Sequence, residues 1–584
     1  MDFPSWLGIE RRICVNFDAI GDGATTTPAC AIIEAMTATH EVFNQSSPLE
    51  NVNLFEIDLP LREALTREGG AWAEDRASAL GAICGSREVL RQGAEANEFP
   101  PKLKAFDRFG NRIDEVEFHP AWHNLMRLSF EHQIHSLPWI EPQVGANVAR
   151  AAIMTQMNHA EAGVGCPVSM TYSVIPALRH QPDVAAEWEP RFLSSEYDGE
   201  LRPAASKPGC VAGMAMTEKQ GGSDVRANTT RAVALNGGGP GAEYEITGHK
   251  WFCSAPMCDA FLVLAQTESG PSCFLLPRFT PDGELNGFHI QRLKDKLGNR
   301  SNASSEVEFR SAWARMVGEE GRGVRTIIEM VGHTRLDCAI GSSSGMRTGV
   351  AQAIHHASHR SAFGRKLVDQ PLMRNVLADL SVESEAATAS VMRLARSYDE
   401  SAAGDERAEL FKRIATPVLK YWICKRQPSH SVEALECFGG NGYAEESGMP
   451  RLFRESPLMS IWEGSGNVQC LDALRAMVKS PASTEVLFEE IGEARGADGR
   501  LDRFTDRLRD SITGSPETLE IRARRVVEGM ALALQGSQLV RHGDPAVADA
   551  FCASRLDGDR GGAFGTLPSG TDFETIIERN QPLP

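Results

Sequence analysis

The chain has 584 residues, 42% hydrophobic and 24% charged, which is typical of a globular protein with several domains. Its net charge of −18 excludes nonspecific nucleic-acid binding driven by bulk electrostatic attraction, although a local basic patch is compatible with that total. The thirteen cysteines include no Cys-x-x-Cys pair, which predicts reduced thiols and no metal site. The sequence has no run of eighteen apolar residues and no signal-like start, which predicts a cytoplasmic protein without membrane contact.

Changes of pattern along the chain predict an α+β fold in five segments. Residues 1–35 are expected to be a disordered extension or a misassigned translation start, because Met36 is a plausible alternative start. Helix-like periodicity and alternating strand patterns then follow one another. The predicted domains are helical, β, helical and again helical, at residues 36–208, 209–313, 314–478 and 479–584. In the third of these, Pro417 and Pro428 are expected to kink or divide a helix at 408–438.

The segment 213–224 (GMAMTEKQGGSD) begins as a buried strand and ends in a polar turn rich in glycine. Thr217 and Ser223 carry hydroxyl groups that can donate to ring acceptors, and Gly222 lets the backbone approach a flat heterocycle closely. This combination suits a flavin, and the alternative is an ordinary strand that ends in a polar turn. The candidate contacts are Met214, Met216, Thr217, Gly222 and Ser223.

Three further strings carry residues with useful chemistry. Residues 248–254 (GHKWFCS) fit a strand with an aromatic side chain, and residues 360–364 (RSAFG) fit a helix end with an arginine. Residues 461–469 (IWEGSGNVQ) form a glycine-rich turn around Glu463. Taken singly, these strings fit a core strand, a solvated helix end and a turn carboxylate equally well.

Taken together, the strings resemble the acyl-CoA dehydrogenase family from about residue 40 to residue 480. The resemblance implies a helical domain, a β domain and a helical bundle, with FAD that accepts a β-hydrogen as hydride from an acyl-CoA thioester. Glu463 matches the family's catalytic base; the α-proton is very weakly acidic, so the base must be positioned and desolvated. The implied flavin contacts are Met214, Met216, Thr217, Gly222, Ser223, Phe252, Cys253, Ser254, Arg360, Gln370, Trp462, Gly464, Ser465 and Asn467.

The resemblance also predicts an oligomer. Arg360 matches an arginine that in relatives reaches the FAD pyrophosphate of a neighbouring subunit, a role that suits the forked hydrogen bonds of a guanidinium group. FAD sites would then lie between subunits, which implies at least a dimer and, as a dimer of dimers, a homotetramer.

Other strings are closest to one branch of the family, the alkylation-response flavoproteins of bacteria. They include residues 118–123, 292–303 and 460–467. This branch implies weak dehydrogenation and a C-terminal helical domain that binds double-stranded DNA. Arg475 matches an arginine near the active-site cleft, where its charge would keep Glu463 ionised but lower its basicity; a surface salt bridge is an equal alternative.

The C-terminal segment supports its DNA role only in part. Residues 479–584 hold thirteen Lys and Arg against eighteen Asp and Glu. The candidate basic stripes are Arg503, Arg507 and Arg509, then Arg522, Arg524 and Arg525, with a further run at Arg292, Lys294, Lys296 and Arg300. Aspartates interleave the first group, which is the pattern of a solvated, salt-bridged helix. The alternatives are a catabolic acyl-CoA dehydrogenase without a DNA role and a DNA-shielding flavoprotein without turnover.

Overall fold

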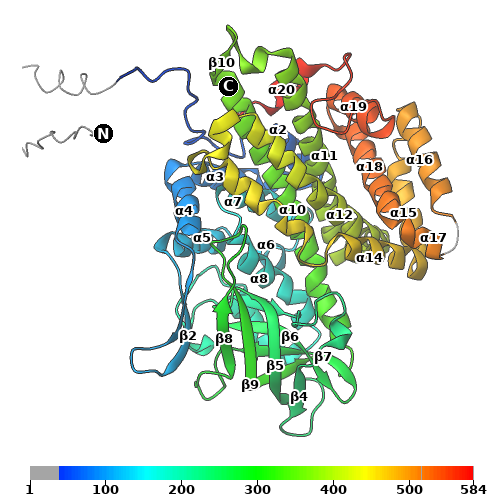
Figure 1. Cartoon of the computed structure of the whole chain (residues 1–584). Helices are drawn as coiled ribbons and strands as arrows, with labels where there is room; N and C mark the ends of the chain where they lie inside the picture. The colour runs from blue at the N-terminus through cyan, green and yellow to red at the C-terminus, as the bar shows by residue number, and fades with distance from the viewer. Residues whose placement is uncertain (1–38, 514–515, 583–584) are drawn as a thin grey trace, which may run out of the picture. The chain divides into compact units, whose positions relative to one another are not determined.

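The computed structural model describes residues 39–513 and 516–582, and residue contacts divide the chain between Gln45 and Ser46. The described part of the first unit contains no helix or strand, and every element named below belongs to the second unit (Figure 1). The predictions for residues 1–35 concern positions outside the described residues. Within the described ranges, no helix is long and apolar enough to cross a membrane.

The second unit begins with helices that pack on one another. They are α2 (Leu59–Arg67), α3 (Glu74–Cys84), α4 (Arg87–Glu98), α5 (Pro120–Glu131), α6 (Leu137–Ile140), α7 (Ala146–Ala160), α8 (Gly165–Leu178) and α9 (Pro182–Phe192). A hairpin of β1 (Lys102–Phe106) and β2 (Arg112–Glu117) interrupts them. The helical pattern predicted for this segment did not anticipate the hairpin, whose two strands leave the helical layer in Figure 1.

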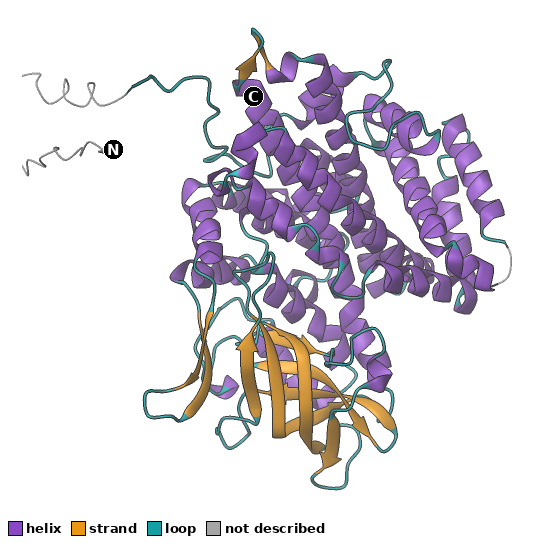
Figure 2. Ribbon diagram, in the orientation of Figure 1, coloured by secondary structure: helices purple, strands orange, loops and turns teal. Residues whose placement is uncertain are grey.

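The central strands form one sheet that closes on itself (Figure 2). They are β3 (Ala212–Ala215), β4 (Arg231–Ala234), β5 (Glu243–Ser254), β6 (Ala260–Thr267), β7 (Gly270–Pro277), β8 (Phe288–Leu293) and β9 (Ser304–Val317). Their order is β3-β6-β4-β5-β9-β7, and β7 also pairs with β6, while β8 pairs with β9. The apolar runs of β6 and β7 are buried, as expected for strands covered on both faces.

Three long helices follow the sheet: α10 (Gly323–His359), α11 (Pro371–Ala402) and α12 (Glu406–Glu436). Pro417 and Pro428 lie inside α12, which the structure gives as one continuous helix, so the prediction of a division there is wrong. Packing against α10 and α11 offsets the lost backbone hydrogen bonds. Helices α13 (Met449–Glu455) and α14 (Gly466–Lys479) complete this part, and the predicted α+β fold is confirmed.

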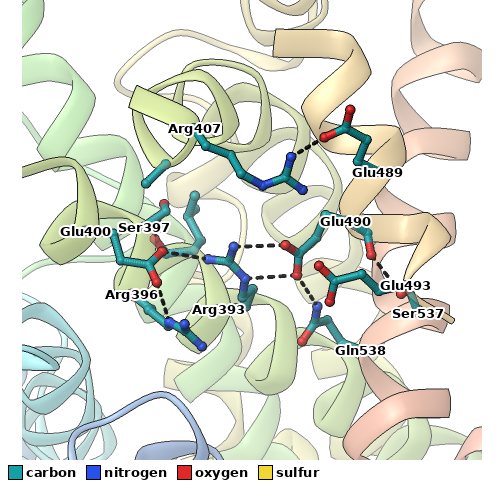
Figure 3. Close-up of polar contacts among 12 residues, drawn as sticks. Arg393, Arg396, Ser397, Glu400, Arg407, Glu489, Glu490, Glu493, Ser537 and Gln538 are labelled. Carbon is teal, nitrogen blue, oxygen red and sulfur yellow. Dashed lines mark hydrogen bonds and ion pairs between the residues drawn. The ribbon is translucent and has the colours of Figure 1, made fainter. Parts of the chain in front are cut away.

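The additional C-terminal segment is helical, as predicted. It contains α15 (Pro481–Gly492), α16 (Gly499–Ser511), α17 (Pro516–Ile521), α18 (Ala523–His542), α19 (Pro545–Phe551) and α20 (Phe573–Asn580). Figure 3 shows how ion pairs attach it: Glu490 of α15 accepts hydrogen bonds from Arg393 Nε and Nη2 of α11 at 3.0 and 2.9 Å. Gln538 and Arg541 of α18 donate to the same carboxylate at 3.1 and 3.2 Å. One buried carboxylate therefore joins three helices.

Candidate active site

The glycine-rich turn follows strand β3 directly. Met214 is buried in the strand, whereas Met216 and Thr217 are partly exposed. Gly222 folds back so closely that a Cβ atom there would collide with Thr217 Oγ1, so the turn requires glycine at this position. The Trp251 N–H of β5 donates to the Thr217 carbonyl at 2.8 Å. The two predicted motifs therefore lie side by side.

An ion pair that the sequence analysis missed holds these two motifs together. Glu218 and Lys250 have fully buried side chains, and Lys250 Nζ lies 3.1 Å from Glu218 Oε1. Lys250 also donates to the carbonyls of Met216 at 3.4 Å and Leu264 at 2.8 Å. The Thr229 N–H donates to Glu218 Oε2 at 2.7 Å, and the Thr230 N–H donates to Oε1 at 3.1 Å. Burial lowers the pKa of Lys250 to about 8 against the attraction of Glu218.

The end of β5 presents side chains to two opposite sides. A bulge between Lys250 and Cys253 interrupts the register with β9, and next to it the Phe252 side chain is 51% exposed. Ser254 is partly exposed. The Cys253 thiol is fully buried, and that burial raises its pKa to about 12. The flavin contact of Cys253 therefore stays a prediction, in which its backbone rather than its buried thiol would make the contact.

The basic run at 292–300 does not form a single surface patch. Arg292 and Lys294 both pair with Glu306, and Lys294 Nζ lies 3.8 Å from the centre of the Trp251 ring. Lys296 points inward and donates to the Asn302 carbonyl at 2.7 Å. Arg292 and Lys294 thus share one carboxylate, whereas Lys296 binds a backbone carbonyl.

Side chains of α10 and α12 hold the loop that carries Glu463 by hydrogen bonds to its carbonyl groups. Lys420 Nζ of α12 donates to the carbonyls of Trp462 and Gly464 at 2.8 and 2.6 Å. Arg335 Nε of α10 donates to the Glu463 carbonyl at 3.1 Å. Glu463 has φ of 56°, an uncommon conformation for a residue other than glycine, and these donors hold it there.

The carboxyl group of Glu463 meets a hydroxyl group and two nearby cations. Thr334 Oγ1 donates to Glu463 Oε2 at 2.8 Å. Burial raises the pKa of Glu463, while the hydrogen bond from Thr334 and the charges of Lys420 and Arg335 lower it. The outcome is a raised pKa, which is what a general base needs. Sequence analysis did not identify Thr334, Arg335 or Lys420, because no motif marks them.

The structure places Arg475 on helix α14, which follows the loop that carries Glu463. It is the tenth residue of α14, so the helix rise carries it roughly 14 Å along the axis from Gly466. Its side chain is 59% exposed and pairs with Asp472 at 3.6 Å. The cations that shift the pKa of Glu463 are Lys420 and Arg335 instead, so the geometry favours the surface-pair alternative for Arg475.

The remainder of the loop opens helix α14. Gly464 has φ of 93°, and Ser465 occupies the first position before the helix without capping it through its side chain. Trp462 Nε1 donates to Met459 Sδ at 3.2 Å. Asn467 Oδ1 accepts a hydrogen bond from Arg524 Nε of α18 at 2.8 Å, so the additional C-terminal segment reaches the predicted catalytic loop.

Arg360 and Gln370 flank a short hairpin of β10 (Ser361–Ala362) and β11 (Arg365–Lys366). Gln370 Nε2 donates to the Ala362 carbonyl at 3.0 Å, and Phe363 at the tip is 100% exposed. Arg360 follows Thr334 by 26 residues along α10, which is about 39 Å of helix. One chain therefore does not bring Arg360 to Glu463.

These residues suit FAD on three grounds. The hydroxyl groups of Thr217 and Ser223 lie in a turn next to the strand that carries the exposed Phe252 ring. Gly222 is exposed and has no side chain, so a ligand can approach its backbone, and no side chain caps the first amides of α14. Uncapped helix amides bind phosphate well. The donor set thus matches a flat heteroaromatic ring with an attached pyrophosphate.

Three family models match successive parts of the chain. They are the acyl-CoA dehydrogenase middle domain at 213–312, the acyl-CoA dehydrogenase C-terminal domain at 321–478 and the adaptive response protein AidB N-terminal domain at 44–199. The chain therefore belongs to the acyl-CoA dehydrogenase family, whose members bind FAD, and it is an FAD-dependent oxidoreductase.

Within the family the chain is a member of the AidB branch. It is 46% identical to "Putative acyl-CoA dehydrogenase AidB" of Escherichia coli (strain K12) over 526 residues, 90% of this chain and 95% of that protein. It is 31% identical to "Acyl-CoA dehydrogenase family member 11" of Caenorhabditis elegans over 66% of this chain and 64% of that one. The crystal structure of Caenorhabditis elegans ACDH-11 in complex with C11-CoA matches with a TM-score of 0.80 and 26% identity, covering 89% and 95% of the two chains.

Proposed function

We propose that Glu463 removes the α-proton of an acyl-CoA thioester. The observation that carries this proposal is the buried Glu463 carboxyl, whose pKa burial raises and whose position Thr334 fixes by a 2.8 Å hydrogen bond. FAD, when bound, accepts the β-hydrogen as hydride. The cations Lys420 and Arg335 oppose the rise of the pKa but do not cancel it. Weak turnover, as in the branch that the sequence resembles, is part of the same proposal.

The substrate class rests on a relative. The ACDH-11 structure contains C11-CoA, which supports an acyl-CoA thioester as the substrate of this chain as well. For the cofactor we propose Thr217, Ser223, Phe252, Ser254 and the amides of the α14 N-terminus as contacts. The predicted domain limits and cytoplasmic location also remain our proposals.

An anaerobic titration of the flavin with acyl-CoA thioesters tests the reaction. We expect slow bleaching of the flavin absorption bands by at least one thioester and loss of at least about 100-fold in rate in Glu463→Gln. Bleaching that is unchanged in Glu463→Gln contradicts the assignment of the base. Rapid turnover with a physiological acceptor would favour a catabolic acyl-CoA dehydrogenase, and a flavin that stays oxidised with every thioester would favour a DNA-shielding role.

We infer a homotetramer in which the hairpin around Phe363 contacts a second subunit. Phe363 is completely exposed near Arg360, which suits a contact with another subunit. Arg360 lies about 39 Å of helix from Thr334, so it can reach a flavin only at a site shared between subunits. Light scattering of wild type and Phe363→Asp measures the oligomeric state. Dissociation of the variant together with weaker FAD binding is the expected result, and an unchanged tetramer with full FAD content contradicts it.

We also propose that double-stranded DNA binds where α12, α14 and α18 meet. Burial raises the pKa of the Cys470 thiol to about 11 against the charges of Arg524 and Lys425, so both cations lie near this thiol, and both are exposed. Arg525 is exposed next to Arg524. Duplex binding measured by fluorescence anisotropy at several salt concentrations should weaken in the Arg524→Ala/Arg525→Ala double variant, with a salt slope smaller by about two. Equal affinity and slope in both proteins would remove this surface from the proposal.

A further inference from the structure

A large cleft lies between the β1–β2 hairpin, helix α5 and the central sheet. Its walls are formed by β2, α5, the loop at 197–201 and the connection between β7 and β8. The cleft has a volume of about 630 Å³, within the range of about 300–1,000 Å³ that is usual for small-molecule sites. None of its lining residues belongs to the candidate active site.

The hairpin wall of the cleft is fixed to the central sheet. Arg112 Nη2 donates to the Ile290 carbonyl of β8 at 2.7 Å, and the Ile290 N–H donates to Asp114 Oδ1 at 3.1 Å. Asp114 Oδ2 also pairs with Arg112 Nε at 2.6 Å. The wall is therefore part of the fold, and the Asp114 carboxylate already has a cation of its own.

The cleft contains a buried cation without a carboxylate partner. Arg278 is 3% exposed and lines the cleft. Its guanidinium group donates to the Pro256 carbonyl and, at 2.9 Å, to the Asp114 carbonyl, but it forms no ion pair within residues 39–513 and 516–582. Burial lowers the pKa of Arg278, and Asp114 opposes that change. Buried charges are normally paired, so this wall of the cleft suits an anion.

Helix α5 adds two more polar groups to the same cleft. His123 and Arg127 are four residues apart, so they lie on one face of the helix. Arg127 is exposed, donates to Asn124 Oδ1 at 2.9 Å and forms no ion pair in the described part of the chain. His123 Nδ1 lies 3.0 Å from the Tyr197 hydroxyl group, its one hydrogen bond among the described residues. A second cation and a free imidazole Nε2 are thus available to a ligand.

The carboxylates at the rim of the cleft are compensated, and the rest of its wall is largely apolar. Glu115 and Glu200 are exposed. Glu200 pairs with Arg202 at 3.4 Å, and Glu115 lies opposite Lys104 across the hairpin. The apolar side chains of the wall include Val116, Leu201, Met257, Phe279 and Leu285.

We propose that this cleft binds a small organic acid, whose carboxylate pairs with Arg127 and supplies the negative charge that Arg278 lacks. Its apolar body lies against side chains such as Val116 and Phe279. A guanidinium group suits a carboxylate through forked, charge-assisted hydrogen bonds, whereas a bare inorganic anion would leave the apolar wall uncovered. This site is additional to the proposed dehydrogenation at Glu463 and does not depend on it.

Calorimetric titration of the FAD-loaded full-length protein with 2-naphthoate and its neutral isostere 2-naphthamide tests the inference. We expect the wild type to bind 2-naphthoate roughly 10-fold or more tightly than 2-naphthamide, and added salt to weaken 2-naphthoate alone. Arg127→Gln should weaken 2-naphthoate by about 5-fold or more and leave 2-naphthamide nearly unchanged. Val116→Trp, which fills part of the apolar wall, should weaken both probes.

Arg108→Gln is the matched control. Arg108 lies in the turn between β1 and β2, stacks on Phe109 and lines no part of the cleft, so its loss removes the same charge from the same hairpin. Its replacement should leave both affinities unchanged, and full FAD content shows that each variant is folded. Equal affinity for the two probes in the wild type, or no binding of 2-naphthoate at about 1 mM, overturns the inference. Binding of 2-naphthoate that survives both Arg127→Gln and Val116→Trp places the ligand elsewhere and overturns it as well.

Discussion

The buried pair of Glu218 and Lys250 gives the sharpest prediction for stability. Lys250→Met removes the cation and leaves the Glu218 carboxylate in a site with no water access, still paired to the Thr229 and Thr230 N–H groups. Removing one partner of a buried ion pair costs about 3–5 kcal/mol. Lys250 also donates to two carbonyls, so the upper half of that range is expected. Urea unfolding of the FAD-free protein measures the loss.

The double variant Glu218→Gln/Lys250→Met separates charge burial from packing. The glutamine oxygen still accepts from the two threonine amides, and no charge remains buried, so we expect the double variant to recover at least about half of the loss. A Lys250→Met variant within about 1 kcal/mol of the wild type would refute the reasoning, because a tolerated lone carboxylate means that water reaches the site. Equal losses in the single and double variants would assign the effect to packing instead.

Three further predictions concern the base and the attachment of the C-terminal helices. Thr334→Val removes a hydrogen bond that lowers the pKa of Glu463, so the ascending limb of the pH profile of flavin reduction should move to higher pH; an unmoved limb refutes this. Arg475→Ala should change the rate of flavin reduction by less than about 2-fold, since the side chain is exposed and bound to Asp472, whereas a loss of 10-fold or more restores its catalytic role. Burial raises the pKa of Glu490, but Arg393 and Arg541 outweigh it and hold that pKa at about 2; this stability contribution is therefore complete above pH 4.5 and is lost as the pH falls toward 2. Glu490→Gln should cost about 3 kcal/mol at pH 7 and almost nothing near pH 2, measured by urea unfolding at both pH values.

The order of domains could be predicted because each has its own periodicity. Alternation and apolar runs marked β5 and β6, and helical spacing marked α10 and α11. The hairpin at β1 and β2 was missed because its burial alternates only weakly, so its sequence lacks a clear apolar face. The two prolines do not divide α12, because tertiary packing, which no local pattern reveals, keeps that helix continuous.

Some residues of the candidate site stand in local sequence motifs, whereas others reach it only through the fold. Glu463, Thr217 and Ser223 stand in recognisable strings, and the structure tests none of their roles. Thr334 and Lys420 approach Glu463 from helices 129 and 43 residues earlier in the chain, so only the folded backbone brings them together. Which of Phe252 and Cys253 turns its side chain inward is decided by the register of β5 with β9, which the sequence alone does not give.

The arginines of the C-terminal segment explain why its charge count is a poor test of DNA binding. Arg541 pairs with Glu490 within the segment, and Arg555 pairs with Asp379 and Glu383 of α11. These cations are therefore committed to carboxylates of the protein. A total of thirteen basic residues therefore overstates the charge available to phosphate. What matters is which cations remain accessible after docking. On that criterion Arg524 counts, because its side chain is exposed while its Nε donates to Asn467 Oδ1 at the start of α14, four residues after Glu463. A phosphate ligand on Arg524 would therefore bind close to the start of α14.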